Sequence, residues 1–397
     1  MLSFTIMGAF GSFSNFINLY LERTLGFTGS QIGLVVMISM GLIIIINPIL
    51  GIIGDKTGLH VLMLKIAFFM STIFMFLLSN SSGFGLVLLI LIGFEISRAC
   101  IAPFIDLIMS NFCTKNKVDF GRVRVYSSIG FMITVMSVGF MIGGLQIPWF
   151  NSNVIGFSGF LSIGQAMFFT AITFFFVSFL LMFFVPKPDK KTNAIETKIK
   201  ISDITTLLKN KEYQFIIIFI ILSLVALESS KTFVGNHLVI GLGAGENIVS
   251  IMTFMMVLPE FILIPQGSRL IRFFGVKKWY IFSMVTMLIR LLVYATTQNI
   301  TLFALASLLH GVGVATHISG NIAFIRRVVS GKILGLAFTI MVSIIAFSRA
   351  ILSFVNGWLY EVYDGFAVFK LAAFLVFLGL LWVIKSKSLG QMSRSDV

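Results

Sequence analysis

The residues best suited to chemistry are eight charged side chains inside otherwise apolar stretches of the chain. The basic members are Arg98, Lys231, Arg290 and Arg349, and the acidic members are Glu95, Asp106, Glu228 and Glu260. If these stretches cross a membrane, each charge costs at least about 2.5–3.5 kcal/mol at a helix centre, so it is usually an ion-pathway or substrate-pathway residue with a partner nearby. The equal numbers of acids and bases allow them to neutralise one another.

Three of these charges share one helical stripe in the first half of the chain. Glu95, Arg98 and Asp106 are separated by 3 and 11 residues, a spacing that keeps them on one face of a single helix. Glu95 and Arg98 are one turn apart, and we expect them to form a structural pair. Asp106 is then free for Arg124, whose planar fork suits a carboxylate or vicinal hydroxyls. The pair either binds substrate or simply joins two helices.

A second stripe carries two histidines in the second half of the chain. Gly313, His317 and Asn321 follow His310 at separations of 3, 7 and 11 residues, again on one helical face. Histidine titrates near neutral pH and is suited to carrying or gating a proton. Glu260 is a further candidate, because burial favours the protonated form of a carboxyl group. The alternative is that the histidines are buried and only hydrogen-bonded to a neighbouring helix.

Three other charges lie in the apolar stretches of the second half of the chain. Glu228 and Lys231 are one turn apart, and we expect a local pair rather than a proton relay. Arg349 has no partner near it in the sequence and receives no role.

Several kinds of site are excluded by the motifs that the sequence lacks. Cys100 and Cys113 provide neither a disulfide framework nor a metal set. The glycine-rich run 241–245 is not followed by Lys-Ser or Lys-Thr, so it is not a phosphate-binding loop and ATP does not drive the protein directly. No nucleophile constellation is present. The sequence therefore predicts no cofactor, no metal and no enzymatic activity.

The elements that must position these residues are membrane helices. Of the 397 residues 58% are hydrophobic and 11% are charged, whereas soluble domains average roughly 45–50% apolar and about 25% charged residues. A bilayer span needs about 20 mostly apolar residues. We expect twelve spans, near 3–20, 31–53, 61–79, 85–109, 124–145, 162–185, 213–236, 248–265, 280–298, 300–325, 333–356 and 366–385. The first lacks a basic leader and a cleavage site, and we expect it to be retained.

The formal net charge of +14 follows the expected topology. Most of the 29 Lys and Arg residues fall in alternate loops between the expected spans. The positive-inside rule then places both termini in the cytoplasm of a multi-pass protein of the cell membrane. No basic cluster carries the aromatic residues typical of a nucleic-acid surface, so nucleic acid is not an expected partner.

A long polar stretch divides the chain into two sets of six spans. The expected organisation is an N-terminal half, 1–185, a cytoplasmic central loop, 186–212, and a C-terminal half, 213–397. Pro48, Gly51, Asp55 and Gly58 after the second span match Pro265, Ser268, Arg272 and Gly275 after the eighth at identical spacings. A repeated turn is the expected relic of a duplicated six-span unit, with the substrate site near the bilayer midplane. A chance match is the alternative.

The turn after the second span carries a family resemblance. The pattern Gly51-x-x-x-Asp55-Lys56-x-Gly58 resembles the loop signature of the major facilitator superfamily. Its glycines allow a tight turn, and its carboxylate can cap a helix or form an ion pair at the cytoplasmic surface. The resemblance implies an all-α protein of twelve transmembrane helices in two pseudo-symmetric halves.

A narrower resemblance extends along most of the chain. Residues 102–106 and 119–124 resemble the fourth and fifth helices of the lactose permease family. That resemblance implies that Asp106 and Arg124 are the sugar-binding ion pair and that Phe131 takes the place of the stacking tryptophan. Around His317 and at residues 357–360 the chain is more similar to the phenylpropionate-permease-like branch.

The proton-coupling half of the permeases is also recognisable, with one departure. Glu260, Arg290 and His310 resemble the carboxylate, arginine and histidine of that half. The permeases carry a proton-bearing glutamate three residues after the histidine, where this chain has Gly313. The mechanism of the family therefore does not transfer intact, and Glu260 and His310 remain as candidate proton sites.

These observations predict a proton-coupled symporter of a small solute, a sugar or oligosaccharide, that works by alternating access. Asp106, Arg124 and Phe131 are the expected substrate-binding residues, and Glu95, Arg98, His317 and Asn321 are expected to support the site. The alternatives are uptake of small aromatic carboxylic acids or nucleosides, and proton-driven drug export. The expected partners are the substrate, a proton and the lipid bilayer, and we expect a monomer.

Overall fold

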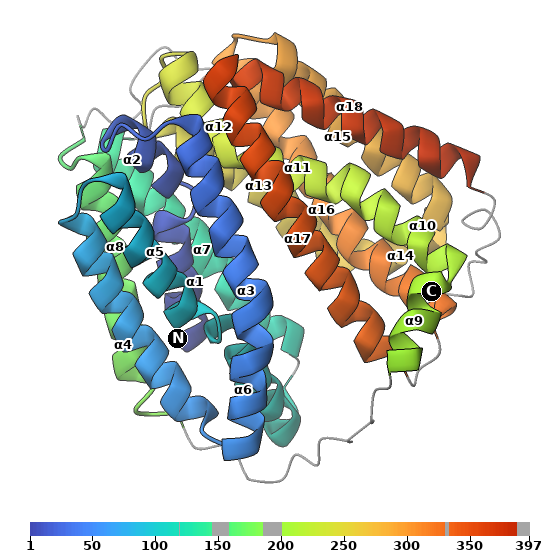
Figure 1. Cartoon of the computed structure of the whole chain (residues 1–397), viewed down its shortest axis with the longest axis horizontal. Helices are drawn as coiled ribbons and strands as arrows, with labels where there is room; N and C mark the ends of the chain where they lie inside the picture. The colour runs from blue at the N-terminus through green and yellow to red at the C-terminus, as the bar shows by residue number, and fades with distance from the viewer. Residues whose placement is uncertain (119, 145–158, 186–200, 330–332, 387–397) are drawn as a thin grey trace. The chain divides into compact units, whose positions relative to one another are not determined.

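The computed structural model describes residues 1–118, 120–144, 159–185, 201–329 and 333–386. All regular secondary structure within these ranges is helical (Figure 1). Backbone contacts divide the chain into two compact units. The first comprises Met1–Thr192 and Leu238–Phe254, and the second comprises Asn193–His237 and Met255–Val397.

The first unit contains the eight helices that open the chain. They are α1 (Leu2–Phe13), α2 (Ile17–Arg23), α3 (Gly29–Thr57), α4 (His60–Ser79), α5 (Phe84–Arg98), α6 (Ile101–Asn116), α7 (Phe120–Gly143) and α8 (Ile163–Leu181). Helix α1 packs against both α7 and α8, and α4 packs against α5 and α8. Phe13, Phe94 and Phe175 join α1, α5 and α8 at ring-centroid distances of 5.2–6.2 Å.

The second unit begins with a short helix, followed by a longer one that starts at Lys211 and changes its winding several times. The segments in order are α9 (Ile201–Lys209), α10 (Lys211–Ile220), the π-helical η1 (Ile221–Val225), α11 (Ala226–Ser230), the 3₁₀-helical η2 (Lys231–Phe233), α12 (Val234–Asn236) and the π-helical η3 (His237–Gly241). The helices that follow are α13 (Ile248–Leu263), η4 (Ile264–Gln266), α14 (Gly267–Phe274), α15 (Val276–Thr296), α16 (Ile300–Val328), α17 (Leu334–Val362) and α18 (Gly365–Lys385). Most of η3 and the start of α13, within Leu238–Phe254, belong to the first unit. Helix α15 runs along both α16 and α18 (Figure 1).

Eleven helical segments of the described chain are long and apolar enough to cross a membrane. The predicted first span differs from the other eleven, because residues 14–16 form a turn between α1 and α2. Ser14 and Asn15 favour such a turn, since their side chains compete with the backbone for hydrogen bonds. The membrane-helix fold is confirmed, and the predicted first span consists of two short helices, α1 and α2.

The predicted turn motif lies mostly within a helix. Gly51, Asp55 and Lys56 belong to the end of α3, which extends to Thr57. Only Gly58 makes the turn, with a φ of 68° that places it in the left-handed region. A side chain added at Gly51 would meet no atom within 4 Å, so this glycine does not serve a tight turn as predicted. Oδ1 of Asp55 instead lies at hydrogen-bond distance, 3.1 Å, from Nε2 of His60 at the start of α4.

The corresponding turn of the second unit also contains a glycine with positive φ. Gly275, at a φ of 78° and a ψ of 151°, separates α14 from α15. At these two matched positions of the predicted repeat, a glycine with positive φ separates two helices.

The predicted central loop contains more structure than its composition suggested. Its described part holds α9, and Leu207 of this helix is buried in the core of the second unit. Apolar residues on one face of a short helix explain this, because they can be buried only by packing on the bundle. Residues 186–200 of the predicted loop lie outside the described residues.

Candidate functional site

The predicted pair in the first unit is confirmed. Nη2 of Arg98 lies 2.7 Å from Oε1 and 2.6 Å from Oε2 of Glu95, one turn away on α5. The guanidinium carbon of Arg98 lies 5.4 Å from the ring centre of Phe10 and 5.5 Å from that of Phe94. Both charges are thus neutralised within one helix and shielded by aromatic rings.

Asp106 does not lie on the same helix as this pair. Helix α5 ends at Arg98, and α6 begins at Ile101. Pro103 explains the interruption, because a proline has no N–H to donate to the carbonyl four residues earlier, here that of Ala99. Asp106 is half-buried on α6, as is Phe131 on α7. The side chain of Arg124 lies outside the described residues, so its pairing with Asp106 stays a prediction.

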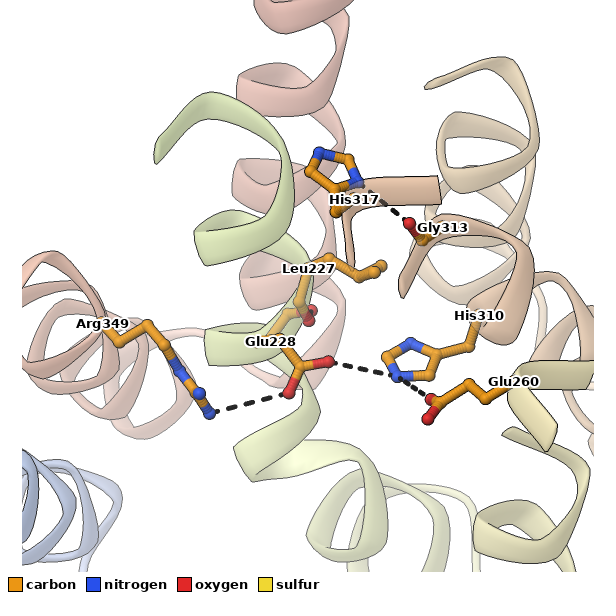
Figure 2. A network of polar contacts seen from close by, with 8 residues as sticks. Leu227, Glu228, Glu260, His310, Gly313, His317 and Arg349 are labelled. Carbon is orange, nitrogen blue, oxygen red and sulfur yellow. Dashed lines mark hydrogen bonds and ion pairs between the residues drawn. The ribbon is translucent and has the colours of Figure 1, made fainter. Parts of the chain in front are cut away.

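The second unit brings the predicted histidine and carboxylate together. Nε2 of His310 on α16 lies 3.2 Å from Oε1 of Glu228 on α11 and 3.6 Å from Oε1 of Glu260 on α13 (Figure 2). His310 is fully buried, whereas the side chains of Glu228 and Glu260 are 18% and 22% exposed. One imidazole nitrogen therefore lies between two carboxylates from two other helices.

The local sequence explains this close approach. A side chain added at Gly311 would lie 2.5 Å from the backbone nitrogen of Glu260 and 2.8 Å from Cβ of Pro259. Glycine at this position lets α16 lie directly against α13 next to His310. The glycine is therefore required for the His310–Glu260 contact.

Arg349 gains a partner that the sequence did not reveal. Its Nη2 lies 3.6 Å from Oε2 of Glu228, so α17 joins the same network (Figure 2). Lys231, the partner expected for Glu228, interacts electrostatically with both Glu228 and Glu260. The residues Glu228, Glu260, His310 and Arg349 are called the carboxylate–histidine network below.

Arg290 makes no hydrogen bond to this network in the described part of the chain, although its charge acts on His310. It is fully buried on α15, and its guanidinium carbon lies 4.4 Å from the ring centre of Tyr294. Its three side-chain nitrogens have no hydrogen-bond partner among the described residues. Glu260, which the sequence placed opposite Arg290, instead has its Oε1 at 3.6 Å from Nε2 of His310.

Gly313 explains in part why Arg290 lacks the carboxylate partner that the permease pattern implies. A side chain added at Gly313 would collide with Met287 on α15. Met287 and Arg290 are three residues apart on α15, so a carboxylate at position 313 would lie close to this arginine. In this protein the side chain of Met287 occupies that space.

His317 and Asn321 lie two to three turns further along α16. Nε2 of His317 is 2.7 Å from Oγ of Ser223, and Nδ1 is 2.9 Å from the carbonyl oxygen of Gly313. The phenol of Tyr280 donates a hydrogen bond of 2.8 Å to Oδ1 of Asn321. Sequence reasoning missed Ser223 and Tyr280, because neither carries a charge that is conspicuous in an apolar segment.

The carboxylate–histidine network can hold protons and join helices at the same time. Two carboxylates facing one imidazole nitrogen titrate as a coupled set, so a proton gained at one group changes the charge felt by the others. Because Glu228, Glu260, His310 and Arg349 come from four helices, each ion pair also fixes a distance between helices. Protonation and helix position are thereby linked.

Comparison with known proteins agrees with this architecture. The model of the MFS_1 like family matches residues 1–371. The uncharacterized transporter YwbF of Bacillus subtilis (strain 168) is 21% identical over 388 residues, which covers 97% of this chain and 92% of that protein.

Solved structures of two transporters share the fold. A variant of the nucleoside transporter NupG superposes with a TM-score of 0.82 at 20% identity, covering 96% of this chain and 97% of that one. The D-xylose-proton symporter superposes with a TM-score of 0.69 at 14% identity, covering 97% and 96%. With a family match over almost its whole length and eleven apolar spanning helices, the chain belongs to the MFS_1-like family and is a multi-pass membrane transporter of the major facilitator superfamily.

Proposed function

We propose that the protein is a proton-coupled symporter that takes up a small hydroxyl-rich solute, a sugar or oligosaccharide, by alternating access. The observation that carries the proposal is the position of His310, whose Nε2 lies within ion-pair distance of Glu228 and Glu260. Buried titratable groups of this kind in a membrane bundle are typical of proton relays in transporters.

Coupling requires that proton binding change the free-energy difference between conformations. Protonation of Glu260 removes one negative charge from the network and leaves Glu228 as the anionic partner of Arg349. That change weakens the attraction of α13 for α16 and leaves the pair between α11 and α17 intact. The helices can then move differently in the protonated and deprotonated states.

Substrate recognition is assigned to Asp106, Arg124 and Phe131 in the first unit. A carboxylate beside a guanidinium can accept from and donate to vicinal hydroxyls, and an aromatic ring can stack on the face of a sugar. A nucleoside is a second candidate, because it carries the same hydroxyl pattern on its ribose and because a nucleoside transporter shares the fold at a TM-score of 0.82.

An aromatic carboxylate is a third candidate, favoured by Arg290. This guanidinium is fully buried and lacks a hydrogen-bond partner in the described part of the chain. A buried unpaired cation is costly, and an anionic substrate group reaching it in another conformation would offset that cost.

The test is a counterflow screen in proteoliposomes with labelled sugars, nucleosides and aromatic acids, followed by a pH step for each substrate that exchanges. We expect exchange of a sugar or nucleoside, and accumulation when the outside is made more acidic. Exchange of aromatic acids alone would replace the proposed substrate class. Exchange without any response to the pH step would exclude proton coupling.

The binding assignment has its own test. Asp106→Asn is expected to abolish substrate binding, because the carboxylate that accepts hydrogen bonds from the substrate hydroxyls is lost. Calorimetry on the purified protein measures the binding. Asp364→Asn is the matched control, since Asp364 caps α18 through the N–H of Ala367 and asparagine can keep that cap. Equal affinity in wild type and Asp106→Asn would contradict the assignment.

A further inference from the structure

Helix α14 lies at the membrane surface, because it connects the span that ends at Gln266 to the span that begins at Val276. Its Ile271 is buried in the core of the second unit, whereas Arg269 and Arg272 are exposed. Residues three apart share a helical face, so the two arginines point away from the bundle together.

Further cations come from the helices that pack against α14. This helix contacts both α15 and α16 (Figure 1), and a side chain added at Gly267 would lie 2.5 Å from Cβ of Ser319. From that contact α16 continues for about two turns to its arginines. Because α15 and α16 are consecutive spans, the end of α16 lies at the same membrane surface as α14. The exposed cations of these three helices, called the basic patch below, are Arg269, Arg272, Lys278, Arg326 and Arg327.

The basic patch has no acidic residue to neutralise it. The sequence contains no Asp or Glu between Glu260 and Glu361. Among the described residues none of these cations forms an ion pair, and neither does Glu212 at the start of α10. The side chain of Asp203 on α9 lies outside the described residues. Like charges on neighbouring helices repel one another, so an anion bound among them would stabilise the packing.

The matched turn of the first unit lacks this feature. Arg272 corresponds to Asp55 in the predicted repeat. Oδ1 of Asp55 lies 3.1 Å from Nε2 of His60, which belongs to the same turn. The matched position is thus an acid with a partner in the first unit and a cation without an ion pair in the second. The turn itself does not require a cation, so the charge of α14 indicates a different task.

A row of aromatic rings leads from the exposed side of α15 to the basic patch. Phe282 lies within the span, is 52% exposed and stacks on Trp279 at a centroid distance of 5.6 Å. Trp279 stacks on Phe274 at 5.9 Å, and Phe274 contacts the 69% exposed ring of Phe273 at 4.8 Å. A tryptophan near the end of a span typically lies at the level of the lipid headgroups. The arginines of α14 therefore lie where a lipid phosphate would be.

We propose that the basic patch binds the phosphate of an anionic phospholipid, whose acyl chains lie along the row of aromatic rings. The planar guanidinium forks of Arg269 and Arg272 suit phosphate oxygens in pairs. The surface is the one that the positive-inside rule predicts to be cytoplasmic, where anionic lipids attract basic segments. A lipid is favoured over a soluble acidic protein, because the rings beside the arginines continue into the spanning part of α15. The site goes beyond the proposed symport, since it requires neither substrate nor a coupled proton.

The test is quenching of Trp279 fluorescence by lipids with brominated acyl chains, in the full-length protein reconstituted into bilayers. The chain has four tryptophans, so Trp149, Trp358 and Trp382 are replaced by phenylalanine and Trp279 alone reports. Brominated phosphatidylglycerol is compared with brominated phosphatidylcholine at equal mole fraction. We expect phosphatidylglycerol to bind beside Trp279 at least about fivefold more tightly, which is the contribution of a single interfacial arginine. Added salt should reduce this preference, because the contact is electrostatic.

Substitutions of the arginines test the assignment. Arg269→Gln combined with Arg272→Gln should lose most of the preference, and so should Arg272→Asp, which introduces the residue of the matched turn. Lys56→Gln is the matched control, because it removes an exposed cation from the corresponding turn of the first unit and should leave the quenching of Trp279 unchanged.

Two results would overturn the proposal. One is equal quenching by both lipids in the wild-type background, which is also the result expected if the patch serves a soluble acidic partner. The other is an unchanged preference after both arginines are replaced. If the variant with a single tryptophan fails to fold, native mass spectrometry of the protein with all its tryptophans counts the lipids retained. Equal retention of phosphatidylglycerol with and without Arg269 and Arg272 would then contradict the proposal. Neither measurement requires transport, so failure of the proposed symport is a separate result.

Discussion

The two units neutralise their buried charges in different ways. In the first unit Glu95 and Arg98 pair within one turn of α5 at 2.6–2.7 Å. In the second unit Glu228, Glu260, His310 and Arg349 come from four different helices and approach one another at 3.2–3.6 Å. A local pair keeps its geometry wherever its helix moves, whereas a pair between helices breaks when they separate. Only the second arrangement can convert a change of charge into a change of conformation.

The largest expected effect comes from removing a charge of the carboxylate–histidine network, whose contacts join different helices. Glu260→Gln should retain substrate exchange down a gradient and lose more than nine-tenths of the accumulation driven by a pH step, because the neutral amide mimics the protonated carboxyl in all states. His310→Gln should have a milder effect. The measurement is exchange and pH-driven accumulation on the same proteoliposomes. Intact accumulation in Glu260→Gln would remove this residue from the coupling mechanism, and equal loss of both activities would make it a purely structural contact.

A smaller effect is expected at the edge of the network. Arg349→Gln leaves Glu228 with His310 and Lys231 as partners and should slow pH-driven accumulation about tenfold, which corresponds to about 1.4 kcal/mol. Glu228→Gln alone should have at least the same effect, since it removes a partner from both His310 and Arg349. The double variant should recover part of the loss, because neither charge is then left unpaired. Strictly additive losses would show that the 3.6 Å pair has no energetic role.

The sequence predicted local features of the site better than its long-range contacts. Glu95 and Arg98 are one turn apart, so helical spacing alone indicated their pair. The contact between Arg349 and Glu228 spans more than a hundred residues and depends on the packing of α17 against α11. Nothing in the spacing of a single sequence records that packing. The same limit explains why the sequence linked Glu228 to Lys231 alone, which does interact with it electrostatically, and not to the partners on other helices.

The fold shows the same division between local and distant information. Hydropathy predicted eleven of the spanning segments, since an apolar run of this length is itself the signal. The turn at residues 14–16 was missed, because its polar residues are too few to lower the hydropathy of the first span. The interruption between α5 and α6 was also missed, although Pro103 marks it once the backbone hydrogen bonds are considered.

The local pair of Glu95 and Arg98 provides a further test of the difference between the two units. Glu95→Gln should lower the stability of the protein by about 1.5–3 kcal/mol, because the guanidinium of Arg98 loses a charge-assisted hydrogen bond. Transport per folded molecule should stay within twofold of the wild type. Thermal unfolding in detergent and transport by reconstituted protein measure the two quantities. A selective loss of pH-driven accumulation would show that the local pair also takes part in coupling.

The smallest expected effects concern the two glycine turns that the units share. Gly58, at a φ of 68° and a ψ of 14°, lies in the left-handed helical region, which alanine can adopt at a cost of about 1 kcal/mol. Gly275, at a φ of 78° and a ψ of 151°, lies in a region that is almost restricted to glycine, where the cost is about 1–3 kcal/mol. Gly275→Ala should therefore destabilise the protein more than Gly58→Ala does. Gly51→Ala is the matched control, because Gly51 is helical with open space around it and alanine should leave stability unchanged or raise it by about 0.5–1 kcal/mol. The same thermal unfolding assay ranks the three variants, and equal losses at Gly58 and Gly275 would show that the two turns are held by their surroundings rather than by their own backbone angles.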